Sequence, residues 1–167
     1  MAASASDRAT AQTAADGHGS PGDRAVTASA PLVEADLGRW KDFLRKQEAL
    51  CAEHGFPAAV LTIGVDDAAE MPKTLDALTG LLRSTDRAGI LCDTEISVVL
   101  VPIETIHHTQ RLVHMIDGGL RARGLAPHIG WAMRLDGHGL FHASARADAA
   151  MLSSRGQGRP SVDLSER

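Results

Sequence analysis

The chain has 167 residues, of which 44% are hydrophobic and 23% are charged, values that predict one compact domain and exclude two ordinary ones. Its formal net charge of −4 provides no basic field for wrapping nucleic acid, so we expect no nucleic-acid partner. Aromatic residues make up only 3%, which leaves the core to leucine, isoleucine, valine and alanine.

The two cysteines and the apolar pattern indicate the compartment. Cys51 and Cys92 have no spacing typical of a metal site, and we interpret both as reduced, part-buried thiols. No apolar run is long enough to span a membrane, and the N-terminus lacks the apolar segment of a secretory signal. We therefore expect a cytoplasmic protein with no membrane partner.

One ordered domain is expected between two tails. Residues 1–31 are rich in alanine, serine, threonine, glycine and aspartate, and we expect a disordered tail because few large apolar side chains are present to offset the entropy of ordering. The domain is expected to cover residues 32–163, and a short tail to follow at 164–167. Apolar residues recur at helical spacing over 33–54, and Gly55 then supplies a stop signal.

The remaining elements alternate in a regular order. A short apolar run at 58–65 predicts a buried strand, and Pro72 suits the first turn of a second helix. The order α, β, α, β, β, α, β, α predicts an α+β sandwich of the ferredoxin-like kind, with helices packed on an antiparallel sheet. After the second helix we expect strands at 88–91 and 95–101, a helix at 104–123, a strand at 126–133, a turn at 136–139 and a helix at 141–154.

Residues 82–105 read LRSTDRAGILCDTEISVVLVPIET: a helix end, an Arg-x-x-Asp, a short strand, a polar turn and a buried strand. This stretch resembles the central hairpin of the GGDEF family, the bacterial diguanylate cyclases that make cyclic di-GMP from two GTP molecules. The family's turn reads Gly-Gly-Asp/Glu-Glu-Phe, and only its fourth position is kept here. The resemblance is therefore to a degenerate member, with the signature replaced by Cys92, Asp93, Thr94, Glu95 and Ile96.

A second block, residues 128–159, is similar to the family's Ser-Ile-Gly strand and to its helix ending Ala-Asp-x-Ala-Leu-Tyr-x-Ala-Lys-x-x-Gly-Arg. The resemblance covers about residues 37 to 162. It implies a nucleotidyl-cyclase-like fold and a role in bacterial signal transduction. The identical positions are Ala147, Asp148, Ala150, Gly158 and Arg159, and Arg155 stands where the family has lysine.

The resemblance also implies what has been lost. The family holds divalent metal with two acids, and the aligned residues here are Gly64 and Thr94, neither of which provides a carboxylate. Asp66 and Asp67 follow closely, and we interpret them as solvated turn or helix-cap acids. The connection 66–73, where the family reads guanine, is shorter and contains no asparagine. We therefore expect no metal, no cofactor and no cyclase activity, which means that the protein is not an enzyme.

Arg83 and Asp86 stand at the spacing of the family's product-inhibition site, which binds cyclic di-GMP. Arginine offers a forked donor to a phosphate or a guanine edge, and aspartate accepts from guanine N–H groups. Arg111 is the nearest candidate for the second arginine of such a site, and Arg87 could also contribute. The alternative is that Arg83 and Asp86 form only a surface ion pair or a cap.

Other polar residues have two interpretations each. Arg155 and Arg159 align with the basic residues that contact the GTP triphosphate in active relatives, or they simply complement the C-terminal dipole of the last helix. Glu95 is either a remnant metal ligand or an exposed acid at a strand edge. His138 and His142 are four residues apart, but His138 falls in a predicted turn and no Glu partner accompanies them, so we reject a histidine metal site.

Two hypotheses remain open. The first is a sensor that binds cyclic di-GMP through Arg83, Asp86 and Arg111. The second is a protein–protein interaction or dimerisation module with no nucleotide ligand. A sensor should lose ligand affinity on Arg83→Ala while staying folded, whereas an interaction module should be indifferent to this change. An enzyme of altered specificity would need a new metal site, and no constellation of residues supplies one.

Overall fold

The computed structural model describes residues 32–163, and the two expected tails, 1–31 and 164–167, lie outside the described residues. The predicted order of the longer helices and strands is confirmed. In chain order the elements are β1 (Leu32–Glu34), α1 (Leu37–His54), β2 (Ala59–Gly64), the 3-10 helix η1 (Ala68–Glu70), α2 (Met71–Thr79), β3 (Arg87–Cys92), β4 (Glu95–Leu100), α3 (Ile106–Arg121), β5 (His128–Met133), α4 (Gly139–Ser154) and β6 (Ser161–Asp163).

The first helix begins later than the apolar pattern predicts. Val33 belongs to β1, and α1 starts at Leu37 because the side chain of Asp36 caps it, accepting a hydrogen bond from the backbone N–H of Arg39 at 2.8 Å. The helix ends where expected, at Gly55, whose φ of 66° lies in the left-handed region. The two short strands β1 and β6 are additional to the predicted elements.

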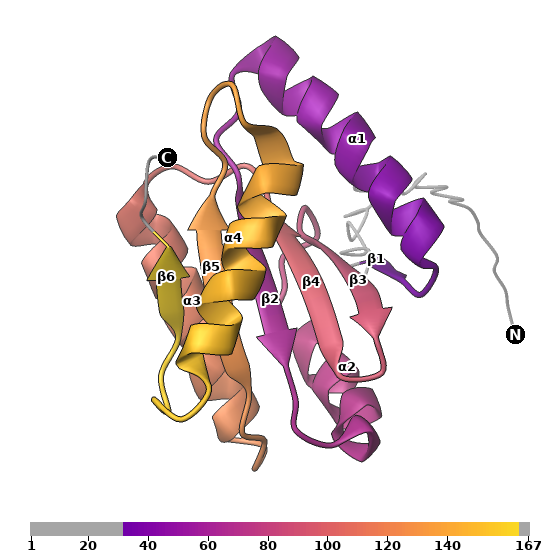
Figure 1. Ribbon diagram of the computed structural model, residues 1–167, viewed down its shortest axis with the longest axis vertical. Coiled ribbons are helices and arrows are strands. Elements are labelled where there is room, and N and C mark those ends of the chain that lie inside the picture. Colours follow the sequence, from indigo (N-terminus) through magenta and orange to yellow (C-terminus); the bar gives the residue numbers. More distant parts are fainter. Residues whose placement is uncertain (1–31, 164–167) are drawn as a thin grey trace, which may run out of the picture.

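A six-stranded sheet with the order β1-β3-β4-β2-β5-β6 forms the centre of the molecule (Figure 1). The four inner strands pair antiparallel, and β2, α2, β3, β4, α3 and β5 give the β-α-β-β-α-β connectivity of the ferredoxin-like fold. This confirms the predicted fold class. The sheet is mixed rather than wholly antiparallel, because β1 and β6 join its edges in parallel to β3 and β5.

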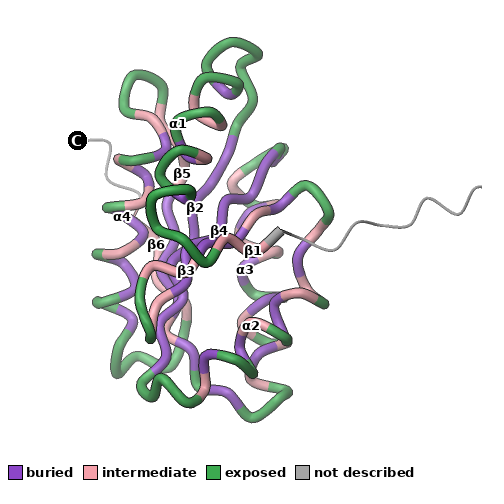
Figure 2. Tube along the Cα trace, turned by 90° about the vertical axis from the view of Figure 1, so that its right-hand side faces the viewer, coloured by how far each residue is buried: buried purple, intermediate pink, exposed green. Residues whose placement is uncertain are grey.

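Each face of the sheet has its own apolar core, since successive side chains of a strand point to opposite faces. Leu61 and Ile63 of β2 pack with α2 and α3, whereas Val60 packs with α1 and α4. The side view in Figure 2 shows the largely buried strands between these two layers of helices. Within residues 32–163 no helix is both long and apolar enough to cross a bilayer.

Helix α4 lies directly on β5 at Gly130. A Cβ atom at this position would come within 1.9 Å of the Met151 nitrogen and 2.2 Å of the Ala147 oxygen. Thr62 is the register partner of Gly130 on β2, and its buried hydroxyl donates a hydrogen bond to the Asp148 carboxylate. Close backbone contact and this hydrogen bond therefore fix α4 against the two central strands.

Glu48 connects α1 to the start of α4. Its carboxylate accepts hydrogen bonds from Nη2 of Arg134 at 2.8 Å and from the backbone N–H of Leu140 at 2.7 Å. Arg134 also donates to the carboxylate of Asp136 at 3.0 Å. The hydrogen bonds from Arg134 hold the pKa of Glu48 below its ordinary value. This carboxylate therefore stays charged into mildly acidic solution.

Both cysteines are free, but their surroundings differ from the expectation of two part-buried thiols. Cys51 belongs to α1 and is fully buried, and desolvation raises the pKa of its thiol. Cys92 is exposed because it ends β3 at the tip of the hairpin.

Candidate functional site

The Arg-x-x-Asp motif lies in the connection between α2 and β3. Asp86 is only 1% exposed. Its carboxylate accepts hydrogen bonds from the backbone N–H of Arg83 at 2.9 Å, from Nε at 3.0 Å and from Nη2 at 2.7 Å. The structure thus brings the two predicted residues together, as a bidentate ion pair whose carboxylate is enclosed.

Arg83 is partly engaged by this pair and partly open. Its Nη1 donates to the main-chain oxygen of Pro102 at 3.3 Å, and 31% of its side chain remains exposed. A guanidinium group has five N–H donors. Nε, one hydrogen of Nη2 and one of Nη1 are directed to Asp86 and Pro102, so two donors are left for a further acceptor.

Arg87, the first residue of β3, is attached to the same turn. Its Nη1 donates to the main-chain oxygens of Ser84 at 2.6 Å and of Asp86 at 2.7 Å. The turn therefore carries two arginines, Arg83 and Arg87, and one buried carboxylate, that of Asp86, which leaves it with an excess of positive charge. Arg111 is exposed on α3, and no hydrogen bond or ion pair within the described residues joins it to Arg83 or Asp86.

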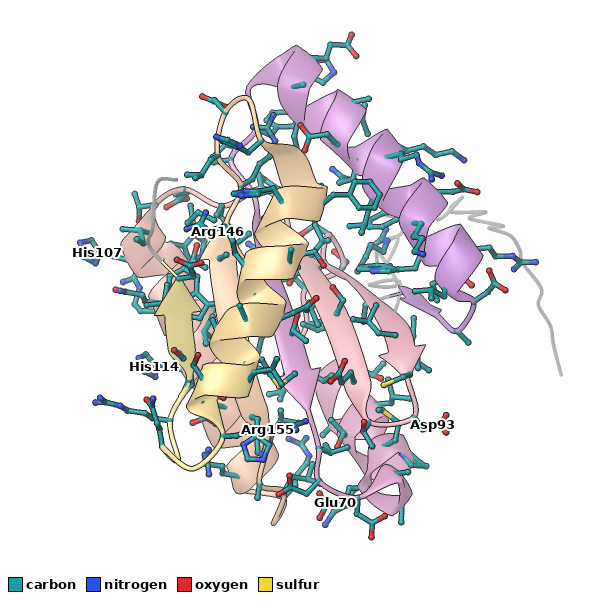
Figure 3. All side chains as sticks on the ribbon, in the orientation of Figure 1. Glu70, Asp93, His107, His114, Arg146 and Arg155 are labelled. Atoms are coloured by element: carbon teal, nitrogen blue, oxygen red, sulfur yellow. The ribbon has the colours of Figure 1, made fainter. Side chains whose placement is uncertain are left out.

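The hairpin that carries the altered signature lies at the other end of β3. Asp93 and Thr94 form the turn between β3 and β4, and Figure 3 shows Asp93 at its tip. The main-chain oxygen of Thr94 accepts a hydrogen bond from the backbone N–H of Val65 at 2.9 Å, which ties the turn to the end of β2. Ile96 is fully buried, so the last signature position contributes to the core.

The acids near this end of the sheet have different surroundings. Glu95 is half-buried at the start of β4, opposite Gly64. Oδ1 of Asp66 lies 2.9 Å from Nε2 of His128. Asp67 accepts a hydrogen bond from the backbone of η1 at 2.9 Å, which confirms its interpretation as a helix-cap acid.

These residues do not fit the divalent metal that the GGDEF resemblance implies. Gly64 and Thr94 offer no carboxylate at the two aligned positions. Within residues 32–163 no three histidine, cysteine, aspartate or glutamate side chains gather in an arrangement that could hold a metal ion.

A pocket of about 370 Å³ lies between the start of α2 and the hairpin. Most of its lining side chains are apolar, and a carboxylate is the one charged group among them. It occupies the connection in which the family reads guanine, but its side chains supply no hydrogen-bond donor. The lining residues are Ala68, Met71, Pro72, Leu75, Ile90 and Asp93.

The remaining candidates lie on the surface. Arg155 and Arg159 are exposed after α4, and in the view of Figure 3 Arg155 lies toward the same end as Asp93. His138 is the residue directly before α4, in the predicted turn, and its ring centroid lies 4.7 Å from that of His142.

No protein-family model and no curated protein matches the sequence. Several solved structures match it in three dimensions. The active GGEEF domain of a diguanylate cyclase from Vibrio cholerae is 13% identical, covers 80% of this chain and 99% of that one, and has a TM-score of 0.66. The GGDEF domain of DgcB from Caulobacter crescentus, in complex with c-di-GMP, is 14% identical, covers 75% and 88%, and has a TM-score of 0.63.

A third match is the diguanylate cyclase SiaD from Pseudomonas aeruginosa in complex with its activator SiaC. It is 17% identical and has a TM-score of 0.66, and the match covers 75% of this chain and 57% of that one. At these identities the likeness establishes the fold. The protein has the fold of GGDEF domains, as the two sequence blocks imply.

The same comparison contradicts one expectation. The altered signature leads the sequence analysis to exclude an enzyme, but the fold is that of active diguanylate cyclases. That expectation is wrong, because it treats side chains at a few aligned positions as sufficient to exclude activity. The match covers 99% of the active domain from Vibrio cholerae.

Proposed function

We propose that this protein is a signalling domain that binds cyclic di-GMP at the turn between α2 and β3, through Arg83, Asp86 and Arg111. One observation supports this proposal most strongly. The guanidinium group of Arg83 is fixed by a buried carboxylate, yet 31% of the side chain stays open to solvent. The c-di-GMP complex of a neighbour with the same fold is consistent with it.

The chemistry of the turn suits a dinucleotide with two phosphodiester groups. A planar guanidinium group binds phosphate oxygens in a bidentate manner, and it loses little conformational freedom when its rotamer is already fixed. Arg111 would supply a second cation from α3. Because these cations are partly solvated, affinity for cyclic di-GMP should fall as ionic strength rises.

The test is a calorimetric titration of cyclic di-GMP into the full chain and into two arginine variants. Arg83→Ala should weaken binding by about tenfold or more, which corresponds to about 1.4 kcal/mol. Arg121→Ala is the matched control, since Arg121 is 36% exposed and is also paired with a carboxylate, that of Asp117, at 2.8 Å. It should leave the affinity unchanged.

The buried carboxylate makes a second variant necessary. Removal of the Arg83 side chain leaves Asp86 with one backbone hydrogen bond, and we expect a loss of about 1 to 3 kcal/mol in the free energy of unfolding. Arg83→Lys keeps a cation beside Asp86 but lacks the fork. A folded Arg83→Lys protein with wild-type affinity, or a wild-type protein that binds no cyclic di-GMP, would contradict the proposal.

Arg155 and Arg159 are proposed as a separate, weaker phosphate site after α4. Both side chains are exposed and lie in a different connection from the Arg83 turn. Their joint replacement by alanine should therefore leave the affinity at the turn unchanged in the same titration.

A protein–protein interaction module is the second candidate. Exposed large apolar side chains on α1 and α4 favour it, among them Leu50, Phe141 and Leu152. In this case Leu152→Ser would change self-association or partner binding, measured by analytical ultracentrifugation, and Arg83→Lys would not. The absence of any change on Leu152→Ser would count against this alternative.

A further inference from the structure

Another pocket lies at the end of the sheet opposite the hairpin. Its volume is about 300 Å³, and two connections form it: residues 55–57 between α1 and β2, and residues 134–136 between β5 and α4. Figure 1 shows both connections at that end of the molecule, and the backbone N–H of Arg134 joins them by donating to the main-chain oxygen of Ala58 at 2.9 Å. The pocket shares no residue with the turn at 83–87.

Arg134 gives this pocket a fixed hydrogen-bond donor, since its side chain is only 8% exposed. Nε and one hydrogen of Nη2 are directed to Glu48, and one hydrogen of Nη1 is directed to Asp136. Of the five N–H donors of a guanidinium group, one on Nη1 and one on Nη2 therefore have no acceptor within residues 32–163. Because Nη1 reaches a carboxylate that is fully exposed, this end of the guanidinium group lies at the open side of the pocket.

The surroundings of Arg134 favour a positive charge in the ligand. The carboxylates of Glu48 and Asp136 outnumber the one guanidinium group, so the cluster is net negative. Oδ1 of Asp136 accepts from Arg134, which leaves Oδ2 as an exposed acceptor. Gly55 lines the pocket at the C-terminal end of α1, where the helix dipole is negative. A simple anion is therefore disfavoured, whereas a ligand that also carries a cation is not.

We propose that this pocket binds an α-amino acid with an apolar side chain. The ligand carboxylate would accept from Nη1 and Nη2 of Arg134, and its ammonium group would donate to Oδ2 of Asp136. Its side chain would cover Phe56, whose side chain is 44% exposed and which lines the pocket with Pro57 and Leu135. A pocket of this volume, at the lower end of the range for small-molecule sites, suits so small a ligand. The site goes beyond the proposed function and does not depend on it.

Titration of L-leucine and L-phenylalanine into the labelled full chain, followed by chemical-shift mapping, tests the site. We expect saturable shifts in the amides of residues 54–57 and 134–137, with a dissociation constant of about 1 mM or tighter for at least one of the two. N-acetyl-L-leucine lacks the ammonium group and 3-methylbutylamine lacks the carboxylate, so each should bind at least about tenfold more weakly than L-leucine. No saturable shifts with either amino acid, or equal affinity for the amine, would overturn the proposal.

Asp136→Asn tests the role of the exposed carboxylate. This change should weaken amino-acid binding by about tenfold or more, and the protein should stay folded because Glu48 remains paired with Arg134. Asp42→Asn is the matched control, since Asp42 is also exposed and paired with an arginine but lies outside this pocket. Wild-type affinity in Asp136→Asn, or an equal loss in both variants, would overturn the proposal. The comparison of L-leucine with its two analogues needs no substitution, so it decides the matter if Asp136→Asn fails to fold.

Discussion

Replacement of Gly130 by alanine is expected to destabilise the protein by about 3 kcal/mol or more, the upper range for overpacking a core. The new methyl group would lie 1.9 Å from the Met151 nitrogen and 2.2 Å from the Ala147 oxygen. Both atoms belong to the backbone of α4, so no side chain can move aside to make room. The whole helix would have to lift from β5, which would also break the hydrogen bond between Thr62 and Asp148.

Urea denaturation followed by circular dichroism measures this loss, and Gly118→Ala is the matched control. Gly118 is a helical glycine of α3 with open space where its Cβ would be. Alanine there should be neutral or stabilising by about 0.5 to 1 kcal/mol, because it raises helix propensity. Equal denaturation midpoints for the two variants would contradict the direct packing of α4 on Gly130.

Neutralisation of Glu48 is the second large effect that we expect. Glu48→Gln leaves Arg134 buried, with Asp136 as its remaining charged partner, and should cost about 3 kcal/mol at neutral pH. The pKa of Glu48 in the folded protein is lowered from an ordinary value of 4.5. The folded state therefore prefers the charged form of Glu48. The resulting stabilisation is complete when the pH is well above 4.5, the ordinary pKa of the group.

The direction of this pKa shift determines how the stability of the fold depends on pH. As the pH falls below 4.5 and through the lowered pKa of Glu48, the wild-type protein should lose the stabilisation, and its melting temperature should approach that of Glu48→Gln. Thermal melts of both proteins between neutral and acidic pH measure the difference. Asp42→Asn, in an exposed pair with Arg45, is the control and should show little effect. A difference that persists unchanged into strong acid would contradict the ion pair.

The long elements could be predicted from sequence because their apolar residues repeat over several turns or pleats. The strands β1 and β6 have three residues each, too few to display an alternating pattern. The apolar pattern consequently assigns Val33 to the first helix, although it lies in β1. The edges of the sheet are set by tertiary pairing with β3 and β5 rather than by local propensity.

The candidate site could be predicted only in part. Arg83 and Asp86 are three residues apart, and that spacing alone indicates that their side chains can meet. Arg83 also donates a hydrogen bond to the main-chain oxygen of Pro102, nineteen residues further along the chain, and no local pattern predicts this contact. Glu48 and Arg134 are separated by 86 residues, so the contact between α1 and the residue that follows β5 has no sequence signal either.

The measurement that tests the central claim most directly is chemical-shift mapping of the labelled protein with cyclic di-GMP. We expect the largest shifts in the amides of residues 83–87 and in the Nε–H groups of Arg83 and Arg111, with the hairpin at 92–95 unchanged. Largest shifts around the pocket formed by Ala68, Leu75 and Asp93, or no shifts at saturating ligand, would contradict the assignment of the ligand site to the turn before β3.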